Sequence, residues 1–297
     1  MSSILDKLYE TRNITNYKIH TDKCTFISTI TENSMSNSFY LHLGGTSKGC
    51  VIIYIDDYKM TDTAILETIK YDSKCNITED LEEGTGTKHM IFTALNILMY
   101  YFPRLKYVKL HDASFKNCYR GDKNGATPSM VLATYFMLFH KKTWYDSLFG
   151  AKPIKPEYKI NYTEFLERMD SIPIKLPFLR FINTYFRDRD LKYVVDLNNR
   201  YNLQLDKLYS SSKTYSELFH TVKEKIGDKE EVCIFFGIFL FRFMNDISNE
   251  TTSKILGDFW IFPTENIIKV HFREEPIDEP IDEPLELTGG YHFTELL

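Results

Sequence analysis

Hydrophobic and polar positions alternate along the first part of the chain in short runs that predict β-strands. Four runs fit this pattern: residues 25–29, 39–43, 50–55 and 63–71. A glycine-rich segment follows the second run, as is typical of a hairpin connection. We therefore expect an antiparallel meander over residues 39–71, with a short helix at residues 4–12 near the start of the chain.

The two-residue period is lost after this meander. Residues 90–102 are apolar on nearly every side, which predicts a helix at residues 88–102 that is buried on more than one face and that Pro103 ends. A short strand at residues 107–110 and a polar loop at residues 116–128 follow. A second long helix is expected at residues 130–149.

The second half of the chain has a mainly helical pattern. Its predicted helices are residues 162–169, 176–186, 191–198, 215–226 and 231–247, and residues 267–272 are the one predicted strand. Prolines 153 and 156 interrupt the pattern between the halves. We therefore predict three parts: an α/β domain at 1–153, a mainly helical region at 154–273 and an acidic, Pro-rich tail at 274–297.

The tail contains three tandem four-residue units, which begin at Glu275, Glu279 and Glu283. Proline in every unit forbids a regular helix, and the acidic residues repel one another. One interpretation is an extended, solvated spacer. The other is a strap that lays its apolar positions onto a protein partner, and the sequence favours neither.

Composition predicts a soluble, globular protein. The hydrophobic fraction is 43% and the charged fraction 26% in 297 residues, which supplies a sizeable core. The net charge of −5 gives no general attraction to nucleic acid or to an anionic membrane. Residues 232–244, the most apolar segment, are too short for a membrane span, and the first residues lack the pattern of a signal peptide. We therefore expect an intracellular protein that is not secreted.

The five cysteines are widely spaced, and none forms a Cys-x-x-Cys pair. They are Cys24, Cys50, Cys75, Cys118 and Cys233. The odd number and the spacing argue against a disulfide framework and against a zinc knuckle. We expect reduced, mostly buried thiols in a reducing compartment, and no metal site is predicted.

A glycine-containing loop precedes the first long helix and reads Gly84-Thr85-Gly86-Thr87-Lys88. Glycines let the backbone approach a ligand closely, and the free N–H groups at a helix start attract phosphate. Thr87 adds a hydroxyl and Lys88 a positive charge. The strand, loop, helix and following strand together form one β–loop–α–β unit.

The order of these elements resembles the GNAT superfamily of N-acetyltransferases over about residues 25–153. Gly84 and Gly86 match the two glycines of that family's loop. The later segment Trp144-Tyr145-Asp146-Ser147-Leu148-Phe149-Gly150-Ala151 looks like the family's helix-end motif. The resemblance implies an α+β fold with a mixed, mainly antiparallel sheet and helices on both faces, followed by a mainly helical C-terminal region.

The same resemblance implies roles for individual residues. The loop residues Gly84–Lys88 would bind the pyrophosphate of acetyl-CoA or of another acyl-CoA. Tyr145 would be the general acid that protonates the leaving thiolate, and Glu67 on the fourth strand a base or a water-positioning group. The implied activity is acyl-CoA-dependent acylation of an amine by direct attack.

A non-catalytic interpretation stays open beside this one. Leu81 stands where the family has Arg or Gln, and Glu82 and Glu83 place two negative charges near the expected pyrophosphate. Such departures favour a GNAT-like scaffold used as a binding or assembly protein. The abundance of aromatic residues, Lys, Asn and Ile suggests an AT-rich genome, and a large DNA virus would place the protein in a virion or capsid-associated role, or in the host cytoplasm.

Two further groups of polar residues are weaker candidates. His111, Asp112 and Ser114 are the residue types of a hydrolytic triad, but triads are assembled from distant segments. We interpret them as a strand end with a polar turn. Asp56, Asp57 and Asp62 carry the ligand type of a hard cation, and we interpret them as a solvated turn.

Overall fold

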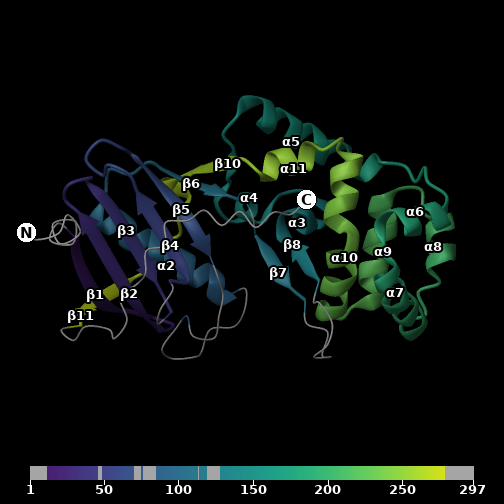
Figure 1. Cartoon of the computed structure of the whole chain (residues 1–297), viewed down its shortest axis with the longest axis horizontal. Helices are drawn as coiled ribbons and strands as arrows, with labels where there is room; N and C mark the ends of the chain where they lie inside the picture. The colour runs from purple at the N-terminus through teal and green to yellow at the C-terminus, as the bar shows by residue number, and fades with distance from the viewer. Residues whose placement is uncertain are drawn as a thin grey trace, which may run out of the picture. The chain divides into compact units, whose positions relative to one another are not determined.

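The computed structural model describes residues 12–45, 49–69, 75, 85–112, 114–118 and 128–277 (Figure 1). The chain forms two compact units: unit 1 comprises residues 1–109 and 263–297, and unit 2 comprises residues 110–262. The chain passes from one unit to the other within β6 (Tyr107–His111) and returns within β10 (Phe259–Pro263). This division differs from the parts expected at 1–153, 154–273 and 274–297.

Unit 1 is built on a mainly antiparallel sheet with the strand order β11-β1-β2-β3-β4-β5-β6. Its further strands are β1 (Arg12–Thr21), β2 (Thr25–Asn33), β3 (Ser38–Leu43), β4 (Val51–Ile55), β5 (Thr63–Ile69) and β11 (Phe272–Pro276). All neighbours from β11 to β5 pair antiparallel, so the predicted meander is confirmed. The broad prediction of an α+β fold with a large antiparallel sheet is confirmed with it.

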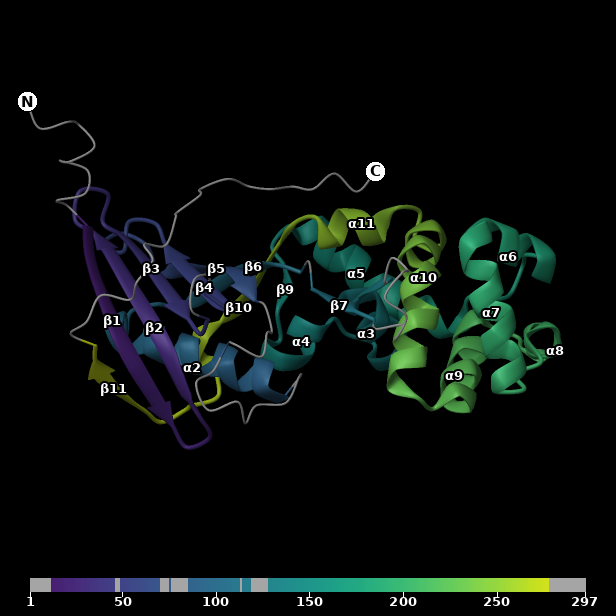
Figure 2. The ribbon, with the colours of Figure 1, turned by 60° about the horizontal axis from the view of Figure 1, so that its bottom comes forward.

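Helix α2 (Thr85–Tyr101) packs on this sheet over β3 and β4 (Figure 2). Its apolar composition fits this position, because Phe39 of β3 contacts Phe102 at 4.6 Å and Tyr101 at 6.1 Å between ring centroids. Burial of such aromatic side chains is the main stabilising contribution at this contact. The helix predicted at residues 88–102 is therefore confirmed and begins slightly earlier. Helices on both faces of the sheet stay a prediction.

The first strand of the sheet was not expected from the sequence. Arg12, predicted to end a helix, begins β1, and residues 4–11 of that predicted helix lie outside the described residues. The segment 12–21 is rich in Asn, Thr and Lys, so its hydrophobic pattern is weak. It is a strand because it pairs with β2 on one side and with β11 on the other.

The predicted strand at residues 267–272 is wrong in position. The strands near it are β10 and β11, and a 3₁₀ turn, η2 (Thr264–Asn266), follows β10 directly. Residues 274–276, the first residues of the predicted tail, belong to β11, and the Ile277 amide donates to the Asn16 carbonyl at 3.0 Å. The remainder of the tail, residues 278–297, lies outside the described residues.

Unit 2 is mainly helical. Its strands are β7 (Phe115–Asn117), β8 (Ser129–Val131) and β9 (Lys152–Pro153). Its helices are α3 (Leu132–His140), α4 (Trp144–Phe149), α5 (Pro156–Arg168), α6 (Phe178–Tyr185), α7 (Asp188–Arg200), α8 (Leu205–Ser211), α9 (Tyr215–Ile226), α10 (Lys229–Ile247) and α11 (Thr251–Leu256), with a 3₁₀ turn, η1 (Met169–Ser171). Helices α8 and α11 were not predicted.

The long helix expected at residues 130–149 is wrong. Met130 lies in β8, which pairs antiparallel with β7. Lys141 then adopts a left-handed conformation with φ 56°, which ends α3. Thr143 caps the new helix α4 by accepting a hydrogen bond from the Asp146 amide at 3.2 Å. Apolar composition alone did not reveal these breaks. Of the predicted polar loop, residues 116–117 belong to β7 and residues 119–127 lie outside the described residues.

Helix α10 is the centre of the aromatic core of unit 2. Phe243 contacts Tyr215 at 4.8 Å and Phe219 at 5.1 Å, and Phe239 contacts Phe186 at 4.8 Å, all between ring centroids. These rings join α6, α9 and α10 around one apolar centre. Although α10 is long and apolar, no helix in the described part of the chain meets the length and hydropathy that a membrane span requires.

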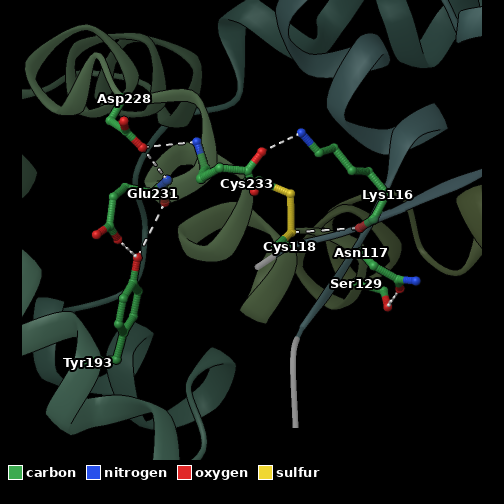
Figure 3. Close-up of a disulfide and its surroundings, with 9 residues drawn as sticks. Lys116, Asn117, Cys118, Ser129, Tyr193, Asp228, Glu231 and Cys233 are labelled. Atoms are coloured by element: carbon green, nitrogen blue, oxygen red, sulfur yellow. Dashed lines mark hydrogen bonds and ion pairs between the residues drawn. A yellow bond between two sulfur atoms is a disulfide. The ribbon is translucent and has the colours of Figure 1, made fainter. Parts of the chain in front are cut away.

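Two disulfides contradict the expectation that the cysteines are reduced. Cys50 is bonded to Cys75 in unit 1, and Cys118 to Cys233 in unit 2, with Cα–Cα distances of 5.8 and 5.5 Å. The second bond ties the end of β7 to the first turns of α10 (Figure 3). The fold brings together cysteines that are far apart in the sequence. Their spacing along the chain therefore did not indicate which of them pair. Disulfides persist in oxidising environments, which argues against a reducing site of folding.

We predict that the protein purified without reductant carries these two disulfides and one thiol, that of Cys24, which is buried. Alkylation after denaturation, before and after reduction, followed by peptide mass spectrometry, measures this. One alkylated cysteine is expected before reduction and five after it. Detection of five thiols before reduction, or of another pairing, would contradict the structure.

Candidate functional site

The predicted phosphate loop is described only from its second residue. Gly84 lies outside the described residues, and Thr85 is the first residue of α2. Gly86 is buried, Thr87 half-buried and Lys88 exposed. The first turn of α2 itself holds no acidic side chain, while Glu82 and Glu83, which precede it in the sequence, lie outside the described residues. This end of α2 is electrostatically compatible with an anion.

Glu67 occupies a β-bulge in unit 1. Across β4 and β5, Ile52 faces Thr68 whereas Ile53 faces Leu66, so Glu67 is the extra residue without a partner opposite it. Bulges re-aim a side chain and are frequent beside active sites. The side chain is exposed, and partial desolvation of its carboxyl raises the pKa of Glu67 above the ordinary value.

Tyr145 lies in the short helix α4 of unit 2. The Thr143 cap starts this helix, and Gly150, with φ 67°, ends it in a left-handed conformation that glycine adopts without strain. Tyr145 is only 5% exposed and packs against Trp144 with ring centroids 4.9 Å apart. Burial, and then the nearby Asp112 carboxylate, raise the pKa of Tyr145, so the phenol keeps its proton at neutral pH.

Asp112 is the most perturbed carboxylate beside this helix. It follows β6 directly and is 1% exposed. Burial raises its pKa from 3.8 to about 6, opposed by interactions with the Ser114 and Thr143 hydroxyls and reinforced by the charge of Asp146. The Ser114 hydroxyl donates to Oδ1 at 2.9 Å, whereas Oδ2 is buried without a hydrogen-bond partner among the described residues. A buried acceptor with no donor is costly, and such atoms cluster at functional sites.

Asp146, a second buried carboxylate, belongs to α4 itself and is paired with a cation. Its Oδ2 accepts hydrogen bonds from the Lys152 ammonium at 2.7 Å and from the Tyr162 hydroxyl at 2.8 Å. The Tyr162 hydroxyl accepts in turn from the Thr143 amide at 2.9 Å. This network joins α4, β9 and α5 and fixes the backbone that carries Tyr145. Asp146 is therefore a positioning residue, and Asp112 has the reactive environment.

The weaker sequence candidates do not assemble as sites. His111 lies against Phe259, with ring centroids 3.8 Å apart, while Ser114 bonds Asp112 directly, so no imidazole stands between them. Asp56 accepts from Tyr54, and Asp62 pairs with Lys106 at 3.6 Å. Within the described ranges, no group of three or more His, Cys, Asp or Glu side chains is arranged to hold a metal ion.

The structure groups the predicted residues differently from the sequence. Glu67 and the start of α2 belong to unit 1, whereas Tyr145 belongs to unit 2, where it is grouped with Asp112. The pairing of Asp112 with Tyr145, and the support from Thr143, Lys152 and Tyr162, were missed. The one signal in the sequence for this pairing was the position of Asp112, an acidic residue directly after the apolar strand Tyr107–His111.

Comparison with known proteins identified no relative of this chain. The chain matches no known family model, curated protein or solved structure. The GNAT resemblance therefore stays a prediction.

We predict that Asp112→Asn changes the pH dependence of stability. The pKa of Asp112 is raised from 3.8 to about 6 in the folded protein, so the native state binds the extra proton and the wild type loses stability as pH rises through about 6. A shift of this size corresponds to about 3 kcal/mol. The free energy of unfolding of Asp112→Asn, from urea denaturation between pH 4 and 7.5, should lack this loss.

Asp206→Asn, at an exposed position of α8, is the matched control and should keep the wild-type profile. Equal pH profiles for the wild type and Asp112→Asn would show that the Asp112 carboxyl is not perturbed.

Proposed function

We propose that the protein is a divergent N-acyltransferase that uses an acyl-CoA to acylate an amine. The observation that carries this proposal is the environment of Asp112 and Tyr145 in unit 2. The GNAT resemblance implies an acid role for Tyr145, and this residue is buried near a carboxyl with a pKa of about 6. A buried group that titrates near neutral pH is what acid–base catalysis requires.

Those residues of the expected acyl-CoA loop that the structure describes are compatible with binding an anion. The first turn of α2 presents the backbone N–H groups of a helix start, contains no acidic side chain and carries the exposed Lys88. The same resemblance assigns a GNAT-like arrangement to the sheet, with further helices on its second face. The bulge at Glu67 is consistent with a strand adapted for ligand binding.

Acyl-CoA would supply an activated thioester, and the amine would form a C–N bond as the C–S bond breaks. Tyr145 holds a proton at its hydroxyl and is the proposed donor to the leaving sulfur. Asp112, mostly ionised above pH 6, is the proposed acceptor of the proton lost by the amine. Return of that proton from Asp112 to Tyr145 restores both groups. For Glu67 in unit 1, the GNAT resemblance implies a role as a base or a water-positioning group.

We predict that Tyr145→Phe slows acyl transfer without weakening acyl-CoA binding, because the hydroxyl moves a proton and the ring keeps its packing. Loss of a general acid reduces the rate by about 10²-fold or more. Free thiol released from acetyl-CoA in the presence of spermidine or a lysine peptide measures the rate, and calorimetry measures acetyl-CoA affinity.

Tyr100→Phe, which removes an exposed tyrosine hydroxyl, should behave as the wild type. Gly86→Glu, which places a carboxylate at the start of α2, should abolish the calorimetric signal. The absence of heat from the wild type with acetyl-CoA and with longer acyl-CoAs would rule out the enzyme proposal.

A second candidate function is a non-catalytic GNAT-like scaffold that serves as a binding or assembly protein, such as a virion component. The specific observation in its favour is that the tail begins as strand β11 on the edge of the sheet. His20 bonds Glu275 at 3.0 Å, and Tyr101 bonds Glu274 at 3.0 Å, so the exit of the tail is fixed. A fixed exit presents the repeats from a defined edge.

The scaffold proposal predicts that the full chain forms assemblies that a chain ending at Ile277 does not form. The truncation keeps β11 and removes the apolar positions Ile281 and Leu285 of the repeats. Light scattering after size exclusion measures the mass of each protein. Asp282→Asn is the matched control, since it changes a tail charge and keeps length and apolar residues. Equal masses for both chain lengths would count against the scaffold.

A further inference from the structure

The outer edge of the sheet in unit 1 is only partly covered by its edge strand. That strand is β11, which lies beside β1 (Figure 1). Their antiparallel register ends with Tyr17 opposite Pro276, and the Ile277 amide extends it to the Asn16 carbonyl. β1 continues for four more residues, 12–15, which pair with β2. In the described part of the chain, no strand pairs with the other side of residues 12–15.

The hydrogen bond between Ile277 and Asn16 shows which backbone groups face this open edge. In an antiparallel strand the N–H and C=O of one residue point to the same side, and successive residues point to opposite sides. Since the Asn16 carbonyl faces β11, the N–H and C=O of Ile14 face the same edge. Ile14 also has a 59% exposed side chain. Such an edge is a template for a further stretch of strand.

The acidic, Pro-rich tail follows β11 directly and is the segment closest in sequence to this edge. In an antiparallel pair, each further residue of one strand lies opposite the preceding residue of the other. Continuation of the observed register therefore places Asp278 opposite Thr15. Glu279 then lies opposite Ile14, and these two residues would exchange both backbone hydrogen bonds, since they follow the bonded pair of Ile277 and Asn16 by two positions.

The prolines of the repeats fall where an edge strand tolerates them. Pro276 already lies in β11, at a position whose backbone N faces away from β1, so no bond between the strands is lost there. The repeats have a period of four residues, an even number, so Pro280 and Pro284 face the same outer side in a continued strand. A period of three or five residues would place every second proline against β1. The spacing of the prolines therefore fits an edge strand.

The isoleucines of the repeats fall on the face of the sheet that carries the exposed Ile14. Glu274 bonds Tyr101 of α2, so the even-numbered residues of β11 lie on the face that α2 covers. Ile277 and Ile281 are odd-numbered and lie on the opposite face of a continued strand, together with Ile14. There they are the two diagonal neighbours of Ile14, at a separation that side chains can bridge. The pairing thus buries apolar surface that β11 alone leaves exposed.

We propose that residues 278–281 of the tail pair with residues 12–15 of β1 in the same chain and so complete the edge strand. The same chain is favoured over a second copy because β11 already occupies the adjoining edge and leads straight into this segment. The completed strand presents prolines on its outer side, which closes the edge of β1 to strand addition by other chains. This role of the tail goes beyond the proposed acyl transfer and does not depend on it.

Amide hydrogen exchange, followed by NMR in the full chain and in a chain that ends at Ile277, tests the pairing. The Ile14 amide should exchange about 10-fold more slowly in the full chain, because it donates to the Glu279 carbonyl there. The Lys18 amide is the internal control, because Lys18 pairs with Glu275 in both proteins, and it should exchange at the same rate in both. Equal exchange of the Ile14 amide in the two proteins would overturn the proposal.

Paired cysteines test the register and show which chain occupies the edge. Thr15→Cys with Asp278→Cys places two thiols opposite each other on one face, so oxidation should join them within one chain. Thr15→Cys with Glu279→Cys is the matched control, because a shift of one residue turns the second side chain to the other face, and its bond should form about 10-fold more slowly. Non-reducing electrophoresis and peptide mass spectrometry identify each bond.

Two results of the cysteine experiment would overturn the proposal. Equal rates for the two pairs would show that the tail does not hold this register. A bond between two chains, seen as a covalent dimer, would assign the edge to the tail of a second copy. Neither experiment uses acyl-CoA, so the outcome is independent of the proposed transferase activity.

Discussion

One buried carboxylate, Asp146, lies in the short helix α4 and another, Asp112, lies near it, and among the described residues only Asp146 is paired with a cation. Lys152 and Tyr162 satisfy Asp146, and this pairing fixes α4 against α5 and β9. Asp112 interacts with the Ser114 and Thr143 hydroxyls and the Ser114 backbone, but burial is the larger effect and its pKa rises to about 6. The carboxylate paired with Lys152 fixes α4, while Asp112, whose pKa is raised, is the group that the proposed function uses for proton transfer. The position and the protonation of Tyr145 both depend on this asymmetry.

The apolar core of unit 2 offsets the free-energy cost of burying the Asp112 carboxyl. Aromatic side chains of α6, α9 and α10 bury a large apolar area, which offsets the cost of a desolvated carboxyl elsewhere in the unit. The Cys118–Cys233 bond restrains the same helix by closing a long loop, which disfavours the unfolded chain. Lys116 and Glu230 pair at 2.7 Å close to this disulfide.

The sequence predicted those parts of the fold that depend on local pattern. The strands from Phe39 to Ile69 alternate clearly, and α2 is continuously apolar, so both were found. Strand β1 was not, because its polar residues form a strand only between β2 and β11. The break at Lys141 was missed because one left-handed residue leaves no hydrophobic signature.

The candidate site was predicted only in part for the same reason. Tyr145 was selected from a motif, but the raised pKa of Asp112 comes from burial by residues about thirty positions away, which no local pattern encodes. The disulfides depend likewise on which cysteines the fold brings together. Tertiary contact, and not composition, decides whether an acidic residue after a strand is a solvated turn or a reactive carboxyl.

Carbon-13 NMR of the Asp112 carboxyl through a pH titration tests the central claim most directly, because it observes the group itself. The account predicts a midpoint near pH 6, with a smaller accompanying shift at the Tyr145 ring as the neighbouring charge appears. A midpoint near the ordinary value of 3.8, with no response at Tyr145, would contradict the account and leave Asp112 as a solvated turn residue.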